Sequence, residues 1–500
     1  MSLLGIDVGT TGCKCVVFDE NGVQLSSAYR EYRTRAPKPR RAELDAPAVW
    51  HRIKETIAEA VAGAPTEDPV EALSVSSMGE AVVPIASDGG IIGPSILNVD
   101  ARGEEFLPEI RAAVSDSELF ELNGNVLANQ YTLPKIMWVR NHEPELYEKS
   151  HKLLLWGSLV SAELGAEPCV DYALANRTLL FDLEKRDWSE TMLRIGGIDR
   201  DKLPRPVPAG TPIGSVSQSV ARELGLPSGT TIVMGSHDQC ANSIGAGSVR
   251  AGMAMYGMGT FPCITPVYSE RPEVAKMIEL GLNTEHHAVA DLWVSFIYHM
   301  GGASIKWFRD HLASGATEGY EELFREMPEE PGEVLVLPHF APMGPPDYIE
   351  DSTGVLVGLT TETSRGAILR GIVEANALAL KRVTRGLPDL GIVLDELRAV
   401  GGGSRSEAAL QINADVLETT VVQPEVEEAG ALGAAILAGA GVGRYSSAEE
   451  AATTIVHLAR RVEPNPNTVS RYRELFARYE ELRELVVPFT QDWVRKPPRE

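Results

Sequence analysis

The chain has 500 residues, of which 44% are hydrophobic and 23% are charged. This composition is typical of a globular protein, and the length predicts about two to three domains. The 70 Asp and Glu residues exceed the 46 Lys and Arg residues, which gives a net charge of -24. Because like charges repel, this charge disfavours nucleic acid and anionic membranes as partners.

The cysteines and the N-terminus indicate the cellular compartment. The five cysteines are scattered and form no C-x-x-C pair, so we expect neither a disulfide framework nor a zinc ribbon. MSLLGIDVG lacks the basic region of a signal peptide, and no run approaches the ~18 apolar residues of a membrane helix. We therefore expect a cytoplasmic protein.

The first residues predict a β-hairpin. SLLGIDV and CKCVVFDENG have the pattern of strands, and GTTG between them has that of a tight turn. Helical spacing follows over residues 47–63, and EALSVSS at residues 71–77 predicts a strand. Strands and helices continue to alternate up to residue 245, which favours an α/β fold.

An aspartate follows a later buried strand. TTIV at residues 230–233 predicts this strand, and MGSHDQCANSIGAG comes directly after it. Asp238 therefore lies near the carboxyl end of a strand, where open α/β sheets bind their ligands. An aspartate there also suits a helix cap, and this segment alone leaves both interpretations open.

The opening pattern returns in the second half of the chain. MAMYGMGTFPCITPV, from residue 253, again predicts a strand, a Gly-Thr turn and a strand. Residues 396–422 predict a strand, a glycine turn, a helix and another strand. The repeat indicates two domains of related topology, connected by QCANSIGAG. We place them at residues 1–247 and 248–445, with a helical tail at residues 446–500.

Two further segments have distinct patterns. Residues 324–354 are rich in Pro and Gly and predict a long loop that follows the short strand LVLP. Residues 465–487 predict an amphipathic, charged helix on the outside of the protein.

Three glycine turns have the composition of phosphate sites, at residues 9–11, 257–260 and 401–404. Phosphate binding needs backbone N–H groups at close approach, which glycine and small hydroxyl residues permit. Asp7, just before the first turn, would repel a phosphate unless a divalent cation lay between them. Asp7 therefore predicts a magnesium site, with a carboxylate that bonds only to local amides as the alternative.

These segments form a known set. In chain order, GIDVGTTGCK, SHDQCANSIGAG, GMGTF, GGASIKWFRD, LTTETSRGAILRGIVEAN and GGGSRSEAALQINADV resemble the FGGY family of carbohydrate kinases. The resemblance covers residues 3–445 and implies an α/β, two-domain actin-like ATPase (ribonuclease H-like) fold with a central cleft. It also implies an enzyme that uses ATP and Mg²⁺ to phosphorylate a hydroxyl of a small sugar, such as a ketopentose (xylulose), a ketohexose or a polyol.

The same resemblance implies roles for individual residues. Asp238 would be the general base that accepts the proton of the attacking hydroxyl, and Asp7 would help to hold magnesium. Lys306 stands where glycerol kinases have a glutamine, so its role is less defined. The implied nucleotide contacts are Thr10, Thr11, Lys14, Gly259, Thr260, Gly302, Lys306, Gly402 and Ser406.

The sugar side differs from that of the glycerol kinases. Their Arg-Glu pair is replaced by Gly79 and Glu80, a tryptophan by Asn98, and a tyrosine by Gln130, which disfavours glycerol. Many hydrogen-bonding groups remain, and they favour a ketose, its open-chain form or a longer polyol, because a buried polar group left unpaired penalises the wrong substrate. The candidate sugar contacts are Glu80, Asn98, Asp100, Arg102, Gln130 and Gln239, together with Asp238.

Two other classes of protein share parts of this pattern. Residues 401–406 fit a dinucleotide fingerprint with one glycine replaced, so an NAD-dependent dehydrogenase is an alternative. Actin-like and chaperone-like ATPases share the Gly-Thr hairpins but need no sugar-facing Asp238. For His237, contact with the sugar, an effect on Asp238 and local packing all remain open, as do the particular sugar and a homodimeric assembly.

Overall fold

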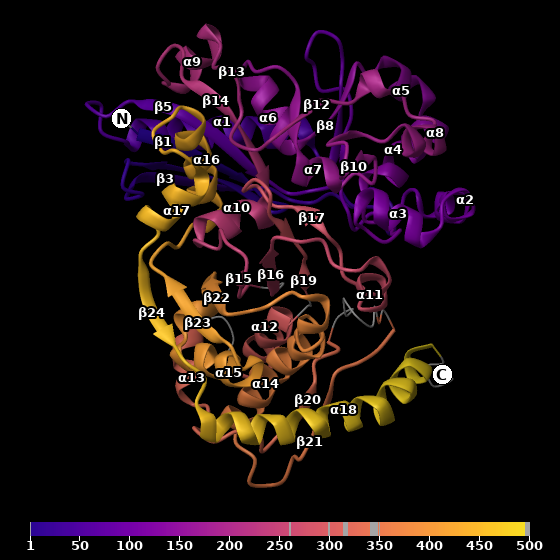
Figure 1. Ribbon diagram of the computed structural model, residues 1–500, viewed down its shortest axis with the longest axis vertical. Helices are drawn as coiled ribbons and strands as arrows, with labels where there is room; N and C mark the ends of the chain where they lie inside the picture. The colour runs from indigo at the N-terminus through magenta and orange to yellow at the C-terminus, as the bar shows by residue number, and fades with distance from the viewer. Residues whose placement is uncertain are drawn as a thin grey trace.

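Two mixed sheets organise the chain into two α/β units (Figure 1). The computed structural model describes residues 2–259, 262–298, 301–313, 319–340, 349 and 351–495. The first unit occupies the upper half of Figure 1, in indigo and magenta, and the second unit lies below it, mainly in orange.

The first sheet has the strand order β13-β14-β5-β1-β2-β3. β1 pairs in parallel with β5, and β5 with β14, whereas the antiparallel hairpin of β1 and β2 places Asp7 opposite Lys14. The hairpin predicted around GTTG and the strands predicted at residues 71–77 and 230–233 are thus confirmed. The bounds are β1 (Ser2–Val8), β2 (Gly12–Phe18), β3 (Gln24–Glu31), β5 (Val70–Ser77), β13 (Pro212–Ser215) and β14 (Thr231–His237).

Smaller sheets extend the first unit: β4 (Glu43–Leu44), β7 (Ser95–Ile96), β6 (Val82–Ile85) and β8 (Lys152–Leu155) form one, β9 (Cys169–Asp171) pairs with β12 (Arg205–Val207), and β10 (Phe181–Asp182) pairs with β11 (Asp187–Trp188). The helices are α1 (Ala46–Gly63), α2 (Leu107–Ala113), α3 (Asp116–Asn123), α4 (Thr132–His142), α5 (Pro144–Lys149), α6 (Trp156–Leu164), α7 (Tyr172–Asn176), α8 (Glu190–Gly196), α9 (Gln218–Leu224) and α10 (Asp238–Gly245). The Asp45 side chain caps α1 by accepting a hydrogen bond from the Ala48 N–H.

The second sheet repeats the plan of the first. Its order is β17-β18-β16-β15-β22-β23-β24, with β19 also paired to β16. An antiparallel hairpin, β15 and β16, again precedes a parallel neighbour, β22, which confirms the predicted repeat. The bounds are β15 (Met253–Gly257), β16 (Cys263–Tyr268), β17 (Glu285–His286), β18 (Trp293–Val294), β19 (Ile297–Tyr298), β22 (Glu396–Val400), β23 (Thr420–Pro424) and β24 (Leu458–Val462).

The remaining elements are β20 (Leu335–Leu337), β21 (Val355–Val357), α11 (Val274–Glu279), α12 (Gly301–Leu312), α13 (Tyr320–Arg325), α14 (Arg365–Thr384), α15 (Glu407–Leu417), α16 (Ala429–Gly441), α17 (Ala448–Ile455) and α18 (Pro466–Arg495). The predicted strand LVLP is confirmed as β20, but most of the loop expected after it, residues 341–348 and 350, lies outside the described residues.

Helix α16 packs on the first sheet, although its sequence lies within residues 248–445. It contacts β1, β5, β14 and α10 and lies beside them at the top of Figure 1. Small residues permit this close approach, because a Cβ at Gly5 would lie 1.8 Å from the Ala431 carbonyl oxygen and one at Gly433 would lie 1.9 Å from that of Ala241. The segment QCANSIGAG, expected as a connection, belongs largely to helix α10 within this packing.

The C-terminal residues complete the second unit. β24 pairs with β23 at the edge of the sheet, and α18 contributes buried Tyr472, Phe476 and Tyr479 to a core cluster. The predicted outer helix is therefore present but also supplies part of the core. The boundaries at residues 247 and 445 stay a prediction. Within the described residues, every helix is too short or too polar to cross a membrane.

Candidate active site

Asp238 lies where strand β14 ends and helix α10 begins. Glycine permits β14 to lie against β5 at this end, because a Cβ at Gly235 would lie 2.0 Å from the Val75 carbonyl oxygen. The Asp238 side chain is 27% exposed, but its Oδ1 is buried and accepts no hydrogen bond from the described residues. This oxygen is therefore available to an incoming donor.

The electrostatic surroundings of Asp238 suit proton transfer near neutral pH. Burial, and then the charges of Asp7 and Glu80, raise the pKa of Asp238 from 3.8 to about 7, although hydrogen bonds from Gln239 oppose the increase. A carboxylate with such a pKa is a far better proton acceptor than an ordinary aspartate. Asp7, Glu80 and Gln239 are thus the residues that influence the pKa of Asp238 most.

His237 both packs and contacts Asp238. Its ring lies 5.2 Å from that of Phe296, and its Nε2 lies 3.2 Å from Asp238 Oδ1. Burial, together with Arg177, lowers the pKa of His237 well below 6.5, so the imidazole is neutral near pH 7. His237 therefore gives Asp238 no positive charge, and the high pKa of the carboxyl group persists.

The first glycine turn lies beside Asp7. Ser76 Oγ donates a hydrogen bond of 2.6 Å to Asp7 Oδ1. Burial raises the pKa of Asp7, and the charge of Glu428 adds to this increase, while Ser76 and Lys14 oppose it. Lys14 Nζ lies 2.5 Å from Glu428 Oε1, just before α16. Thr10 and Thr11 are exposed at the tip of the hairpin.

The second and third glycine turns meet. Met258 N–H donates to the Val400 carbonyl oxygen, and Gly403 N–H donates to that of Met258, at 2.8 and 2.9 Å. Gly401 has φ 86°, a value that favours glycine. Both Gly259 and Gly402 are exposed, and a Cβ at either would have no atom within 4 Å. Thr260 lies outside the described residues.

The remaining predicted nucleotide contacts lie at helix starts. Gly302 is in the first turn of α12. Lys306, one turn later, is exposed and pairs with Asp310. The Ser406 hydroxyl caps α15 by accepting a hydrogen bond from the Ala409 N–H at 3.3 Å.

The predicted sugar contacts fall into two groups. Glu80 and Gln239 lie near Asp238, and Gln130 hydrogen-bonds the Tyr298 hydroxyl. Asp100 and Arg102 instead bond to each other at 2.7 Å, and Arg102 also bonds to Glu43. Asn98, just before Asp100 in the sequence, is half-buried.

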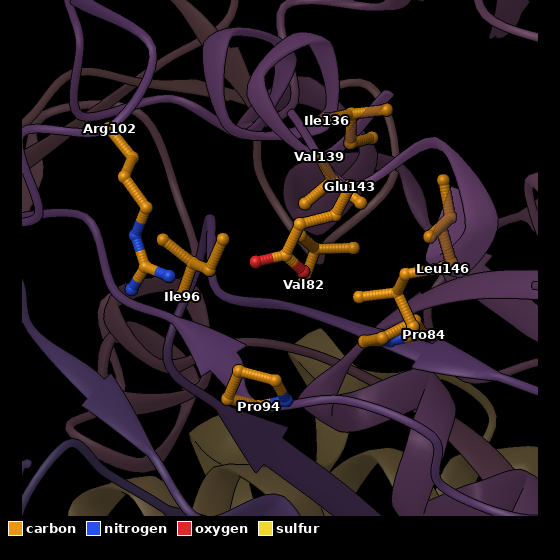
Figure 2. Close-up of a pocket in the computed structure, with 10 residues that line it drawn as sticks. Val82, Pro84, Pro94, Ile96, Arg102, Ile136, Val139, Glu143 and Leu146 are labelled. Atoms are coloured by element: carbon orange, nitrogen blue, oxygen red, sulfur yellow. The ribbon is translucent and has the colours of Figure 1, made fainter. Parts of the chain in front are cut away.

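Arg102 borders a different, mostly apolar pocket (Figure 2). Val82, Ile96, Ile136 and Leu146 line it, with Glu143 as the other charged residue. Asp100 and Arg102 are thus bonded to each other and, through Glu43, to the layer of β4 and β7, and their contact with the sugar stays a prediction.

Sequence patterns missed several residues around Glu80. Arg177, directly after α7, donates from Nε to Glu80 Oε1 and from Nη1 to Glu285 Oε1, each at 2.6 Å. Its guanidinium also lies 5.0 Å from the Tyr131 ring and 5.5 Å from the Phe296 ring. These residues come from segments without a recognisable motif, so no local signal marked them.

Burial also raises the pKa of the Cys263 thiol, at the start of β16, to about 12, and Asp238 adds to this increase. Asp238 is therefore within electrostatic reach of the second hairpin as well as of Asp7. Two α/β units that each begin with a β-hairpin are the architecture of the actin-like two-domain class.

The comparisons with known proteins agree with this class. Residues 2–245 match the N-terminal domain of the FGGY family of carbohydrate kinases, and residues 285–442 match its C-terminal domain. The chain belongs to the FGGY family of carbohydrate kinases. It is a kinase of sugars or polyols and neither a dehydrogenase nor an ATPase without a sugar substrate.

Relatives within this family carry different substrate names. The autoinducer-2 kinase of Klebsiella pneumoniae subsp. pneumoniae is 28% identical over 96% of this chain and 93% of that protein. The glycerol kinase of Bordetella parapertussis is 31% identical over 90% of each. The crystal structure of xylulose kinase from Rhodospirillum rubrum has a TM-score of 0.87 and 25% identity, over 98% of this chain and 100% of that one.

Replacing Asp238 by Asn is expected to stabilise the ligand-free protein above neutral pH. The folded-state pKa of about 7 exceeds the ordinary 3.8. The ionised carboxylate therefore lowers the free energy of unfolding by its full amount above pH 7, and this destabilisation disappears as the pH falls toward 3.8. We expect the free energy of unfolding to rise by about 1–2 kcal/mol at pH 8, or a few degrees in Tm.

Thermal unfolding in EDTA at pH 8 and pH 5 measures this effect. The gain from Asp238→Asn should shrink at pH 5. An equal gain at both pH values would contradict the assigned pKa.

Proposed function

We propose that this enzyme transfers the γ-phosphoryl group of ATP to a hydroxyl of a neutral, open-chain ketose or longer polyol, with Asp238 as general base. The observation that carries the proposal is the buried Oδ1 of Asp238, which accepts no hydrogen bond from the described residues, on a carboxyl group with a pKa of about 7. A sugar hydroxyl donating to Oδ1 would give up its proton there as its oxygen attacks phosphorus.

The nucleotide would bind at the three glycine turns. Exposed Thr10 and Thr11, with Lys14 beneath them, would receive the terminal phosphates from the first unit, and Gly259 would receive them from the second. Gly402 and Ser406 would border the adenosine, because Gly403 and Met258 hold the third turn against the second. Open space where a Cβ would lie at Gly259 and Gly402 supports this assignment, since a ligand can approach the backbone closely there.

Asp7 fits a magnesium ion. Among the described residues, no three His, Cys, Asp or Glu side chains cluster as a complete metal site, and Mg²⁺ commonly takes only one or two carboxylates, with water and phosphate as the other ligands. Asp7 and Asp238 repel each other, and a cation near both would relieve this repulsion. Bound Mg²⁺ would supply neutralisation of phosphate charge.

The charges near Asp238 favour a neutral substrate. Asp7, Glu80 and Glu285 bring negative charge, while Arg177 is already bonded to two of these carboxylates and Lys14 to Glu428. Among the largest influences on the pKa of Asp238 are two negative charges and no positive one. An aldonate would therefore meet like charge without a free cation to bind its carboxylate.

An ADP-release assay over a panel of sugars tests the proposal. The panel is D-xylulose, D-ribulose, D-fructose, xylitol, glycerol and D-gluconate, with the Asp238→Asn protein as background. We expect a neutral ketose or polyol longer than glycerol to exceed gluconate in kcat/KM by about 100-fold, as like-charge repulsion of several kcal/mol implies. A preference for gluconate or glycerol would refute the substrate class.

His237, as a neutral imidazole, would leave Asp238 without a positively charged neighbour. Lys306 would act at the edge of the nucleotide site. A homodimer and a cytoplasmic location stay predictions.

A further inference from the structure

Glu80 has an unusual backbone conformation. Its φ is 57°, in the left-handed region that non-glycine residues rarely adopt, and the residue is only 5% exposed. Thr132 Oγ1 holds its carbonyl oxygen with a hydrogen bond of 2.7 Å. Strained residues persist only where their surroundings fix them, and they concentrate at functional sites.

Arg177 fixes the carboxylate of the same residue. Its Nε and Nη2 both donate to Glu80 Oε1, so Oε2 is the oxygen left for a substrate hydroxyl. Arg177 lies directly against Gly79, where a Cβ would approach its Cγ to 3.2 Å. The aliphatic stem of Arg177 therefore packs beside the backbone turn that carries Glu80.

The position of Arg177 is set from both units. Asp171 caps α7 and accepts a hydrogen bond of 2.8 Å from Ser236 Oγ, which ties the helix to β14 two residues before Asp238. Glu285, on β17 of the second sheet, accepts from Arg177 Nη1 and is held by Asn283 Nδ2 at 2.8 Å. Arg177 is thus a buried link between the two sheets.

We propose that Arg177 is a positioning residue for sugar recognition, which aims Glu80 at the substrate and takes its own orientation from Glu285 of the second unit. The inference rests on the proposed contact between Glu80 and the sugar. A lysine would keep the positive charge of Arg177, but it cannot make the forked hydrogen bonds of a planar guanidinium.

Kinetics of Arg177→Lys test this role, with the panel sugar of highest kcat/KM as substrate. We expect KM for that sugar to rise by about tenfold or more, and KM for ATP to change by less than about twofold. Glu80→Gln should have a similar effect, and the double variant should be no worse than Glu80→Gln alone, because both changes remove one interaction. Additive effects, or an unchanged sugar KM in Arg177→Lys, would overturn the proposal.

Arg370→Lys is the matched control. Arg370 is also a buried arginine, bonded to Glu374 and to the Tyr472 hydroxyl, but it lies in α14, away from Glu80. Its loss should lower Tm without changing the sugar KM. If Arg177→Lys does not fold, Glu285→Gln takes its place, with an expected rise of severalfold in sugar KM and the same non-additivity with Glu80→Gln.

A crystal structure of Arg177→Lys without sugar separates this inference from the proposed function. Movement of the Glu80 carboxylate, or a change of its φ away from 57°, is expected, and an unmoved Glu80 would overturn the positioning role. A normal sugar KM in Glu80→Gln, with Glu80 displaced in the Arg177→Lys crystal, would instead refute only the sugar contact.

Discussion

Asp238→Asn should lower kcat by about three orders of magnitude, the usual size of a general-base contribution. Asparagine keeps the size of the side chain but cannot accept the hydroxyl proton. Nucleotide affinity should change by less than about twofold, because the predicted nucleotide contacts lie on the glycine turns rather than on this side chain. Steady-state kinetics and calorimetric titration of ATP measure the two effects.

Asp415→Asn is the control for this variant. Asp415 is also a buried carboxylate, 2% exposed, but it bonds to Gln411 and to the Asn465 N–H in the second unit. Its kcat should stay within about twofold of the parent value. Full turnover by Asp238→Asn would remove the base assignment, and an equal loss in both variants would show that the loss comes from folding.

Gly433→Val should prevent stable folding. A Cβ at Gly433 would lie 1.9 Å from the Ala241 carbonyl oxygen, and Gly245 faces Ala429 as closely, so backbone atoms of α10 and α16 leave no space for a side chain. Overpacking usually costs about 1–3 kcal/mol, and a clash with the backbone of α10, which cannot move aside as a side chain can, should exceed this range. Because α10 begins at Asp238, any protein that folds should also lose activity.

Chemical denaturation and the yield of soluble protein measure this effect. Gly319→Ala is the control, since a Cβ there would meet no atom within 4 Å, and its free energy of unfolding should change by less than about 0.5 kcal/mol. A Gly433→Val protein as stable as the parent would contradict the close packing of the two helices.

Local patterns in the sequence determined the elements that carry the chemistry. Alternating apolar residues around GTTG and GMGT predict hairpins because strand period and turn composition are properties of a few neighbouring residues. Asp238 could be placed at a strand end for the same reason. Its roles, and those of the residues in the glycine turns, follow from the family resemblance and stay predictions.

Tertiary structure alone decided which charges meet. Arg177 and Glu285 are separated by 108 positions, and nothing in either segment indicates the other. Arg102 and Glu43 are bonded across 59 positions, and neither segment indicates the other; the contact of Arg102 with the sugar stays a prediction. Likewise, α16 lies within residues 248–445 in the sequence, yet it packs on the first sheet. A short pattern reports the burial and turn preference of its own residues, whereas partners distant in sequence are set only when the chain folds.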